Sequence, residues 1–301
     1  MQSESTPHFP PASRLRNEIA RFGTAPPNSG SSIMHITHLN CGAMQPFGGA
    51  GFDGLTPGLA PAELSCHCLL LERDDRLLLI DTGTVSTDPA ADARRHSAFF
   101  LAIDRIRLDP AEAAARQIQA LGRAVDDVSD IVMTHLDFDH AAGLVDFPKA
   151  RIHLAKAEAD AAVHSTDPVS CARYRREQFE DSIERWQTYS GFGEDWFGLA
   201  AEPVAGWDDV LLVALPGHTP GHCGVAIKMG DGWLLHAADA IFNHRELDPV
   251  EPSTPTLARF YQWSIQTSQR QRRRSLHALR RIARDHASEV RIICTHDPAL
   301  F

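Results

Sequence analysis

The sequence Met133-Thr134-His135-Leu136-Asp137-Phe138-Asp139-His140 joins the end of an apolar run to a dense group of polar side chains. The run that leads into it, 130–134, predicts a buried strand. Four side chains that can bind metal then follow within six residues: His135, Asp137, Asp139 and His140. A tight loop after a strand can direct all four into one small volume, and imidazole together with carboxylate suits Zn²⁺, Mn²⁺ or Fe²⁺. Taken alone, the stretch has an alternative explanation as an exposed polar loop with coincidental spacing.

Three further strand-like segments also end in a side chain that can bind metal. The apolar run 211–215 stops at a turn, Pro216-Gly217-His218-Thr219-Pro220-Gly221-His222, which carries two histidines. The run 233–238 ends at Asp239, and the run 290–295 ends at His296. Because four segments each terminate in a ligand type, coincidence explains the whole set less well than it explains the first motif alone.

This ordered series of motifs resembles the metallo-β-lactamase superfamily from about Met34 to the C-terminus. The resemblance implies an α/β fold, a four-layer αββα sandwich in which two mixed sheets face each other and helices cover both outer faces. Residues 33–301 would form this single domain. Residues 1–32, rich in Pro, Ser and Gly, would precede it as an arm that is flexible or packs on a partner subunit.

The resemblance also implies ligands for two divalent transition-metal ions, zinc first and manganese or iron as alternatives. His135, Asp137 and His218 would hold the first ion. Asp139, His140 and His296 would hold the second, and Asp239 would bridge the two. A pair of such ions shares a hydroxide that attacks a carbonyl carbon, while one ion polarises the carbonyl oxygen. Asp139 would pass the proton to the leaving group.

Asp137 departs from the usual pattern of that family, which has His at this position. A carboxylate reaches less far than an imidazole, adds negative charge and favours Mn²⁺ or Fe²⁺ more than His would. We expect Asp137 to bind the first ion; a weak or empty first position is the alternative.

Residues near these ligands have supporting roles in this interpretation. Asp81, in a turn Asp81-Thr82-Gly83 similar to one in the family, either orients a ligand or is a simple turn residue. His222 is expected to support a ligand rather than bind metal. His236 has the opposite strand parity to Asp239 and is interpreted as structural.

Aromatic residues supply candidates for a substrate pocket. Charged and aromatic residues alternate from 170 to 198, including Trp186, Trp196 and Phe197. This segment, near 165–200, predicts either a helical lid that walls the pocket or a peripheral helix that packs ordinary core residues. Phe242 is a further candidate, because it stands three residues after Asp239, where lactonases of the family commonly carry a tyrosine.

The motif pattern is most similar to the branch of the superfamily that contains N-acyl-homoserine lactonases. We therefore expect a dinuclear metallohydrolase that opens a small ester or lactone, with an N-acyl-homoserine lactone, and hence quorum quenching, as a candidate. A hydrolase of β-lactams or other cyclic amides is one alternative. A non-catalytic metal- or ligand-binding protein on the same fold is another, because Asp137 replaces a usual ligand.

The composition of the chain limits the partners and the cellular location that we expect. The chain has 301 residues and a formal net charge of −10, which argues against a nucleic-acid partner. No apolar run reaches the length of a membrane span. Six dispersed cysteines predict reduced thiols, and the start of the chain lacks a secretory pattern, so we expect a cytoplasmic protein. The resemblance suggests a homodimer.

Periodicity and end signals predict the remaining elements. Strands are expected at 34–40, 65–72, 76–80, 151–154, 209–215 and 223–229, and a long loop at 41–61. Helices are expected at 109–121, 155–163, 256–266 and 275–285. The alternation of helices with strands favours an α/β domain.

Overall fold

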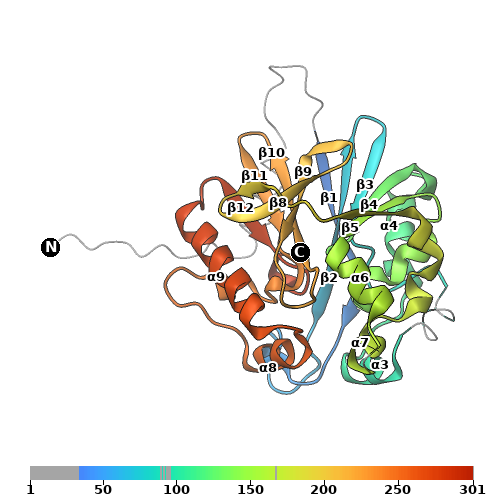
Figure 1. Cartoon of the computed structure of the whole chain (residues 1–301). Helices are drawn as coiled ribbons and strands as arrows, with labels where there is room; N and C mark the ends of the chain where they lie inside the picture. Colours follow the sequence, from blue (N-terminus) through green and yellow to red (C-terminus); the bar gives the residue numbers. More distant parts are fainter. Residues whose placement is uncertain (1–33, 89, 91, 93–95, 167, 301) are drawn as a thin grey trace.

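The structure is a computed structural model that describes residues 34–300 except 89, 91, 93–95 and 167. The predicted N-terminal arm, 1–32, lies outside the described residues. Two six-stranded sheets face each other, and helices lie on both outer sides (Figure 1). The expected four-layer αββα sandwich is therefore confirmed.

The first sheet has the strand order β1-β2-β3-β4-β5-β6. The strands are β1 (His35–Met44), β2 (Leu64–Arg73), β3 (Arg76–Ile80), β4 (Val128–Val132), β5 (Arg151–Ala155) and β6 (Trp186–Tyr189). The first three are antiparallel, and β3 to β6 are parallel. The predicted hairpin is present, with Leu69 opposite Ile80. Because β3, β4 and β5 run parallel, the loops that follow them leave the sheet at one edge.

The second sheet has the order β12-β11-β10-β9-β8-β7. Its strands are β7 (Glu194–Trp196), β8 (Leu199–Val204), β9 (Trp207–Ala214), β10 (Cys223–Met229), β11 (Gly232–His236) and β12 (Val290–Ile293). Neighbours pair antiparallel except β11 and β12, which are parallel. The segments after β11 and β12 therefore leave this sheet at the same edge.

Alternate side chains of β2 and β3 enter different layers of the sandwich. Leu69 and Ile80 join the apolar cluster that includes the second sheet, whereas Leu70 and Leu79 join a cluster with α4 (Ala114–Ala120) and α6 (Lys156–His164). Strands buried on both faces need apolar residues at nearly every position, which explains the continuous run from Leu77 to Ile80.

Helices on the two outer faces complete the layers. α9 (Gln269–Asp285) packs on the second sheet and buries Leu276, Leu279 and Ile282, whose spacing places them on one helix face. The other α-helices are α3 (Ala98–Ile103), α5 (Phe138–Ala141), α7 (Pro168–Arg173) and α8 (Thr256–Ile265). Short 3₁₀ helices are η1 (Gly49–Gly51), η2 (Pro110–Glu112), η3 (Val125–Asp127), η4 (Ala142–Asp146), η5 (Arg176–Gln178), η6 (Glu180–Arg185), η7 (Ala238–Ala240), η8 (His244–Leu247) and η9 (Pro298–Leu300).

Several predicted elements differ from the structure. The helix expected at 109–121 is divided into η2 and α4, because Ala113 has an extended ψ of 136°. β1 continues to Met44, four residues into the expected loop. α9 begins at Gln269 rather than 275, so the basic run that starts at Arg270 lies inside the helix. Neither α3 nor β8 was predicted.

The aromatic segment near 165–200 is not a helical lid. It contains α7, two 3₁₀ helices and the edge strands β6 and β7. Trp186 lies on β6, and Trp196 lies on β7 with its side chain in the core. The aromatic residues of this segment are irregularly spaced, so they carry neither the period of a helix nor that of a strand.

Two predictions made for the whole chain, on membrane spans and on cysteines, can be compared with the described residues. None of the helices there combines the length and apolar character that crossing a membrane requires. All six cysteines are free; Cys171 is exposed and the other five are buried.

Candidate metal centre

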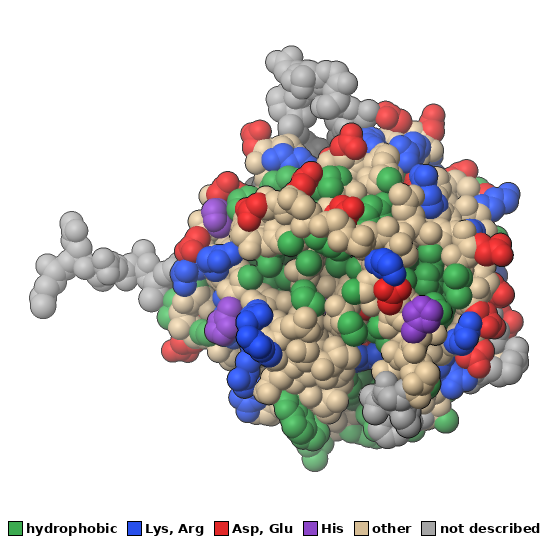
Figure 2. All heavy atoms as spheres, viewed as in Figure 1, with side chains coloured by type: hydrophobic (Ala, Val, Ile, Leu, Met, Phe, Trp, Pro, Cys, Tyr) green, Lys and Arg blue, Asp and Glu red, His purple; other side chains and the backbone are tan. Residues whose placement is uncertain are grey.

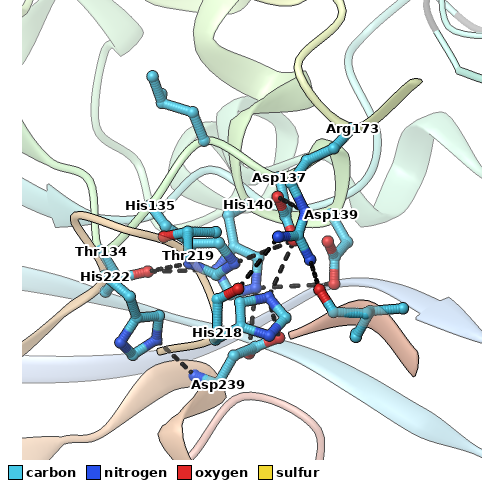
Figure 3. Close-up of polar contacts among 12 residues, drawn as sticks. Thr134, His135, Asp137, Asp139, His140, Arg173, His218, Thr219, His222 and Asp239 are labelled. Carbon is cyan, nitrogen blue, oxygen red and sulfur yellow. Dashed lines mark hydrogen bonds and ion pairs between the residues drawn. The ribbon is translucent and has the colours of Figure 1, made fainter. Parts of the chain in front are cut away.

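The first motif forms a buried loop at the carboxyl end of β4. His135 and Asp137 follow the strand, and Asp139 and His140 lie in the single turn of α5. All four side chains are buried. Figure 3 shows them pointing toward the same region as His218 and Asp239.

The second sheet delivers three more of the predicted ligands to that region. His218 follows β9, Asp239 lies in η7 after β11, and His296 follows β12. Nε2 of His296 lies 3.3 Å from Oδ2 of Asp139, which belongs to the loop of the other sheet. The structure thus brings together seven side chains whose positions in the chain extend from 135 to 296.

The ligand atoms divide into two groups that share Asp239. One group is Asp139, His140, Asp239 and His296, and the other is His135, His218 and Asp239; within each, one ligand atom per residue lies within 4.8 Å of the others. Oδ1 of Asp239 is 3.3 Å from Nε2 of His140, whereas its Oδ2 is 3.5 Å from Nε2 of His218. The position of Asp239 therefore suits a bridge between two cations.

Several of these atoms are buried and have no hydrogen-bond partner among the described residues. They include Nε2 of His135, Nε2 of His140 and Oδ1 of Asp239. A buried polar atom left unpaired costs about 1–3 kcal/mol, so a native cluster of them requires an explanation. Nitrogen and oxygen donors that face one another fit divalent transition-metal ions, and the residues present fit two.

The electrostatic field of the cluster favours positive charge. Burial would lower the pKa of His296, but the carboxylates of Asp239 and Asp139 outweigh it and raise that pKa to about 10. Burial likewise opposes protonation of His140, yet Asp139, Asp239 and Asp81 raise its pKa well above the usual value. A divalent cation would be attracted by the same carboxylates.

Asp81 fixes the orientation of one histidine. Its carboxylate accepts hydrogen bonds from the backbone N–H and the hydroxyl of Thr134 and from Nδ1 of His140, each at 2.8 Å. The contact at Nδ1 leaves Nε2 of His140 directed at the other ligands. Asp81 itself has a φ of +56°, an uncommon conformation for a residue other than glycine.

His222 supports the centre through hydrogen bonds and does not direct a free ring nitrogen toward it. Its Nδ1 donates to the carbonyl oxygen of Leu215 at 2.9 Å, and its Nε2 accepts from the backbone N–H of Asp239 at 3.0 Å. Both ring nitrogens are thereby engaged, and one of them holds the backbone of the bridging residue. His236 donates to the carbonyl oxygen of His67 and lies outside both ligand groups.

The turn that carries His218 and His222 is held between two helices. A Cβ on Gly217, whose φ is +136°, would lie 2.1 Å from the backbone N of Arg272 in α9. A Cβ on Gly221 would lie 2.1 Å from the backbone N of Glu158 in α6. Only glycine permits these approaches, so the two glycines of the turn set the position of its histidines.

Glu158 is a buried residue that the sequence did not indicate. Its carboxylate accepts from the backbone N–H of Leu136 at 3.0 Å, from the hydroxyl of Thr219 at 2.6 Å and from the backbone N–H of Gly221 at 3.1 Å. It therefore ties the loop after β4 to the turn after β9. The close glycine at 221 was the available signal that a helix packs there.

Arg173 is a second functional candidate that sequence reasoning missed. It ends α7, is only 8% exposed, and places Nε 3.0 Å from Oδ1 of Asp137. Asp137 lies outside the two ligand groups above, but its Oδ2 is 2.9 Å from Nε2 of His218 and 3.6 Å from Nε2 of His135. No motif marks Arg173, because its approach depends on the path of the chain after α6.

A small cavity opens beside the centre. It is lined by the site residues Asp137, Asp139, Arg173, His218, Asp239 and His296 and by Met44, Phe100, Phe138, Phe242, Tyr261 and Ile265. Of the four aromatic residues predicted to line a pocket, Phe242 is the one that lines this cavity. The ring of Phe242 lies 4.8 Å from that of His296.

The other three predicted pocket residues lie elsewhere, and that prediction was wrong. Trp186 packs against Phe179 and donates to Ser182. Trp196 and Phe197 pack against each other, and Trp196 also contacts Trp233. These contacts follow from the strand geometry of the segment, which directs its aromatic side chains into the cores on either side of the sandwich.

Comparison with known proteins agrees with this fold. The family described as the metallo-beta-lactamase superfamily matches residues 61–290. The probable metallo-hydrolase Rv2300c of Mycobacterium tuberculosis is 36% identical over 290 residues, covering 96% of this chain and 88% of that protein. The N-acyl homoserine lactonase AttM of Rhizobium radiobacter is 28% identical over 221 residues, covering 73% and 77%.

A solved structure of an N-acyl homoserine lactone hydrolase, with the product N-hexanoyl-L-homoserine bound at its catalytic metal center, has a similar fold. Its TM-score is 0.64 at 21% identity, covering 87% of this chain and 93% of that one. The family match extends over most of the chain, and a full-length relative shares more than a third of the aligned residues. We conclude that the chain belongs to the metallo-β-lactamase superfamily.

Proposed function

We propose that this protein is a dinuclear metallohydrolase that cleaves a small ester or lactone. The observation that carries the proposal is the convergence of buried donors from both sheets, several of them without hydrogen-bond partners. When bound, two divalent cations activate water and polarise a carbonyl group. Zinc is the metal we expect for ligands of imidazole and carboxylate, with manganese and iron as alternatives.

The residues around the cations would divide the remaining work. Asp239 would hold the two ligand groups in a fixed relation, because its Oδ1 faces His140 of one group and its Oδ2 faces both His296 of that group and His218 of the other. Asp139 lines the cavity, which supports a role in carrying a proton to the departing oxygen. Asp81 and His222 would keep His140 and the backbone of Asp239 in position.

The cavity favours a substrate with an apolar portion. Side chains such as Met44, Phe100 and Phe138 form its wall beside the ligands, and aromatic and aliphatic walls bind acyl groups by excluding water. Phe242 offers no hydroxyl to the carbonyl of a substrate. The similarity to AttM supports a lactone, and an N-acyl-homoserine lactone is the first candidate to assay.

Metal analysis tests the proposal most directly. We expect close to two transition-metal ions per chain in protein purified without added metal, and a clear decrease in Asp239→Ala. Asp231→Ala is the matched control, because Asp231 is an exposed carboxylate in the turn after β10. Equal metal content in all three proteins would contradict the assignment of Asp239 as a bridge.

An activity panel separates the remaining functions. Hydrolysis of lactones without hydrolysis of linear aryl esters would favour a lactonase, and hydrolysis of β-lactams would favour the cyclic-amide alternative. Absence of metal together with absence of hydrolysis across the panel would favour a non-catalytic binding protein. Asp139→Asn is expected to lose activity in every case in which the wild type has it.

A homodimer remains a prediction. The exposed Leu257, Phe260 and Trp263 on α8 supply an apolar surface that a second copy of the chain would cover. Figure 2 shows hydrophobic side chains at the lower edge of the molecule, where Figure 1 places α8. Light scattering should give the mass of two chains, and Trp263→Ser should reduce it toward one.

A further inference from the structure

Arg173 is fixed in place by contacts on every side of its guanidinium group. Besides the ion pair with Asp137, Nη1 donates to the carbonyl oxygen of His218 at 3.0 Å and Nη2 donates to that of Ile265 at 2.5 Å. Figure 3 shows the group beside Asp137, above His218. With these partners, Arg173 contacts a ligand side chain and the backbone of a second ligand at once.

The two oxygens of Asp137 face different partners. Oδ1 forms an ion pair with Nε of Arg173 at 3.0 Å and accepts no hydrogen bond from the described residues. Oδ2 accepts a hydrogen bond from Nε2 of His218 at 2.9 Å and lies 3.6 Å from Nε2 of His135. Two ligands of a tetrahedral ion with bonds of about 2.1 Å stand roughly 3.4 Å apart, so Oδ2 is positioned as a third ligand beside these imidazoles.

Arg173 also balances the charge that Asp137 adds. A neutral imidazole at position 137 would leave the carboxylates of Asp139 and Asp239 as the charged ligands. Asp137 adds one negative charge, and the guanidinium group adds one positive charge within ion-pair distance. Because both side chains are buried, each would be costly without the other.

We propose that Arg173 is a positioning residue that makes Asp137 a one-oxygen ligand of the cation held by His135 and His218. In this arrangement Arg173 occupies Oδ1, directs Oδ2 toward the imidazoles and offsets the charge of the carboxylate. The departure from histidine at 137 and the arginine at 173 then form one functional unit. The inference rests on the proposed function, in which the protein binds two cations.

Titration of metal-free protein with Zn²⁺ and Co²⁺ tests the inference independently of activity. We expect Arg173→Met to weaken one of the two sites at least tenfold, about 1.4 kcal/mol, and to leave the other within threefold of the wild type. The Co²⁺ absorption of the weakened site should change as well. Arg259→Met is the control, because Arg259 is an exposed arginine on the neighbouring α8.

The double variant Asp137→His/Arg173→Met distinguishes positioning from general stability. Its imidazole needs no cationic partner, so we expect it to recover two sites within threefold of the wild type. It also buries no unpaired charge, so it carries the test if Arg173→Met does not fold. Asp137→His alone should bind more weakly than the double variant, because it leaves the guanidinium group unpaired beside the cation.

Three results would overturn the inference. The first is unchanged affinity at both sites in Arg173→Met. The second is tighter binding in that variant, which would mean that Arg173 competes with the cation for Asp137. The third is a double variant that binds no better than Asp137→His. Failure of the wild type itself to bind Zn²⁺ or Co²⁺ would overturn the proposed function, which is a separate outcome.

Discussion

Replacing Glu158 should separate the two loops that carry the candidate metal ligands. This side chain is fully buried and accepts three hydrogen bonds, one from the loop after β4 and two from the turn after β9. Leu136, which donates the first, lies between His135 and Asp137. Thr219, which donates the second, follows His218. A change at Glu158 therefore acts on both of these loops without removing any candidate ligand.

The three hydrogen bonds of Glu158 determine how much the free energy of unfolding should fall. Hydrogen bonds to a charged acceptor contribute about 1.5–3 kcal/mol each, and such losses are not additive. For Glu158→Ala, which leaves all three donors without this acceptor, we expect the free energy of unfolding to fall by about 3–5 kcal/mol. Glu158→Gln keeps one oxygen for Leu136 and a group that the Thr219 hydroxyl can bond. Its NH₂ would face the N–H of Gly221, so we expect a loss of about 2 kcal/mol.

Urea denaturation of the metal-free proteins measures these losses, and calorimetric titration with Zn²⁺ measures the effect on the centre. Metal affinity should decrease in the same order, with Ala worse than Gln. Glu184→Gln, at an exposed glutamate of η6, is the control and should match the wild type. The reasoning is refuted if Glu158→Ala costs less than about 1 kcal/mol and leaves Zn²⁺ affinity unchanged.

Three further changes test other parts of the structure. Gly221→Ala would place a methyl group 2.1 Å from the backbone of α6 and should lower the free energy of unfolding by more than about 3 kcal/mol. Gly193→Ala is the control and should be tolerated, because a methyl group there meets nothing within 4 Å. Similar urea midpoints for the two variants would argue against the packing described. Phe242→Tyr adds a hydroxyl to a ring that packs beside His296, and it should raise kcat/KM for lactones about tenfold. A steady-state assay measures this change, and an unchanged kcat/KM would contradict the prediction. Asp130 is fully buried, and although burial alone raises its pKa, hydrogen bonds from His153, Trp207 and others outweigh it and leave the pKa below the usual value. Its stabilising contribution is therefore present above about pH 4 and lost as the pH falls below that value, so Asp130→Asn should cost about 3 kcal/mol at neutral pH and reduce the acid sensitivity of unfolding. Parallel pH profiles for the wild type and Asp130→Asn would disprove this account.

The positions of the candidate ligands could be predicted because each one follows a local pattern. A buried strand has a recognisable apolar run, and a polar residue directly after it must lie at the edge of the sheet, as Asp239 and His296 do. The residues that hold the ligands follow no such pattern. A glutamate in a helix such as α6 ordinarily faces solvent, and nothing local distinguishes Glu158 from the exposed Asp160 of the same helix.

The prediction for the segment near 165–200 was wrong for a different reason. Its strands β6 and β7 have four and three residues, which is too short for periodicity to identify a strand. Both are edge strands whose burial depends on the sheets beside them, so their aromatic residues take positions that only the assembled sandwich decides. The contribution of this segment to the cavity is Arg173, a cation, rather than an aromatic wall.

Glu158 and Arg173 together explain how two sheets can present one set of ligands at ångström precision. The loop after β4 and the turn after β9 belong to different sheets and share few backbone hydrogen bonds, among them one from Cys223 to Thr134. The segment from α6 to α7 contacts both: Glu158 joins Leu136 to the turn, and Arg173 joins Asp137 to the backbone of His218. Because the two residues connect the same pair of loops through different atoms, substitutions at both should be less than additive in their effect on Zn²⁺ affinity. Losses that add fully would show instead that each residue holds its own ligand independently.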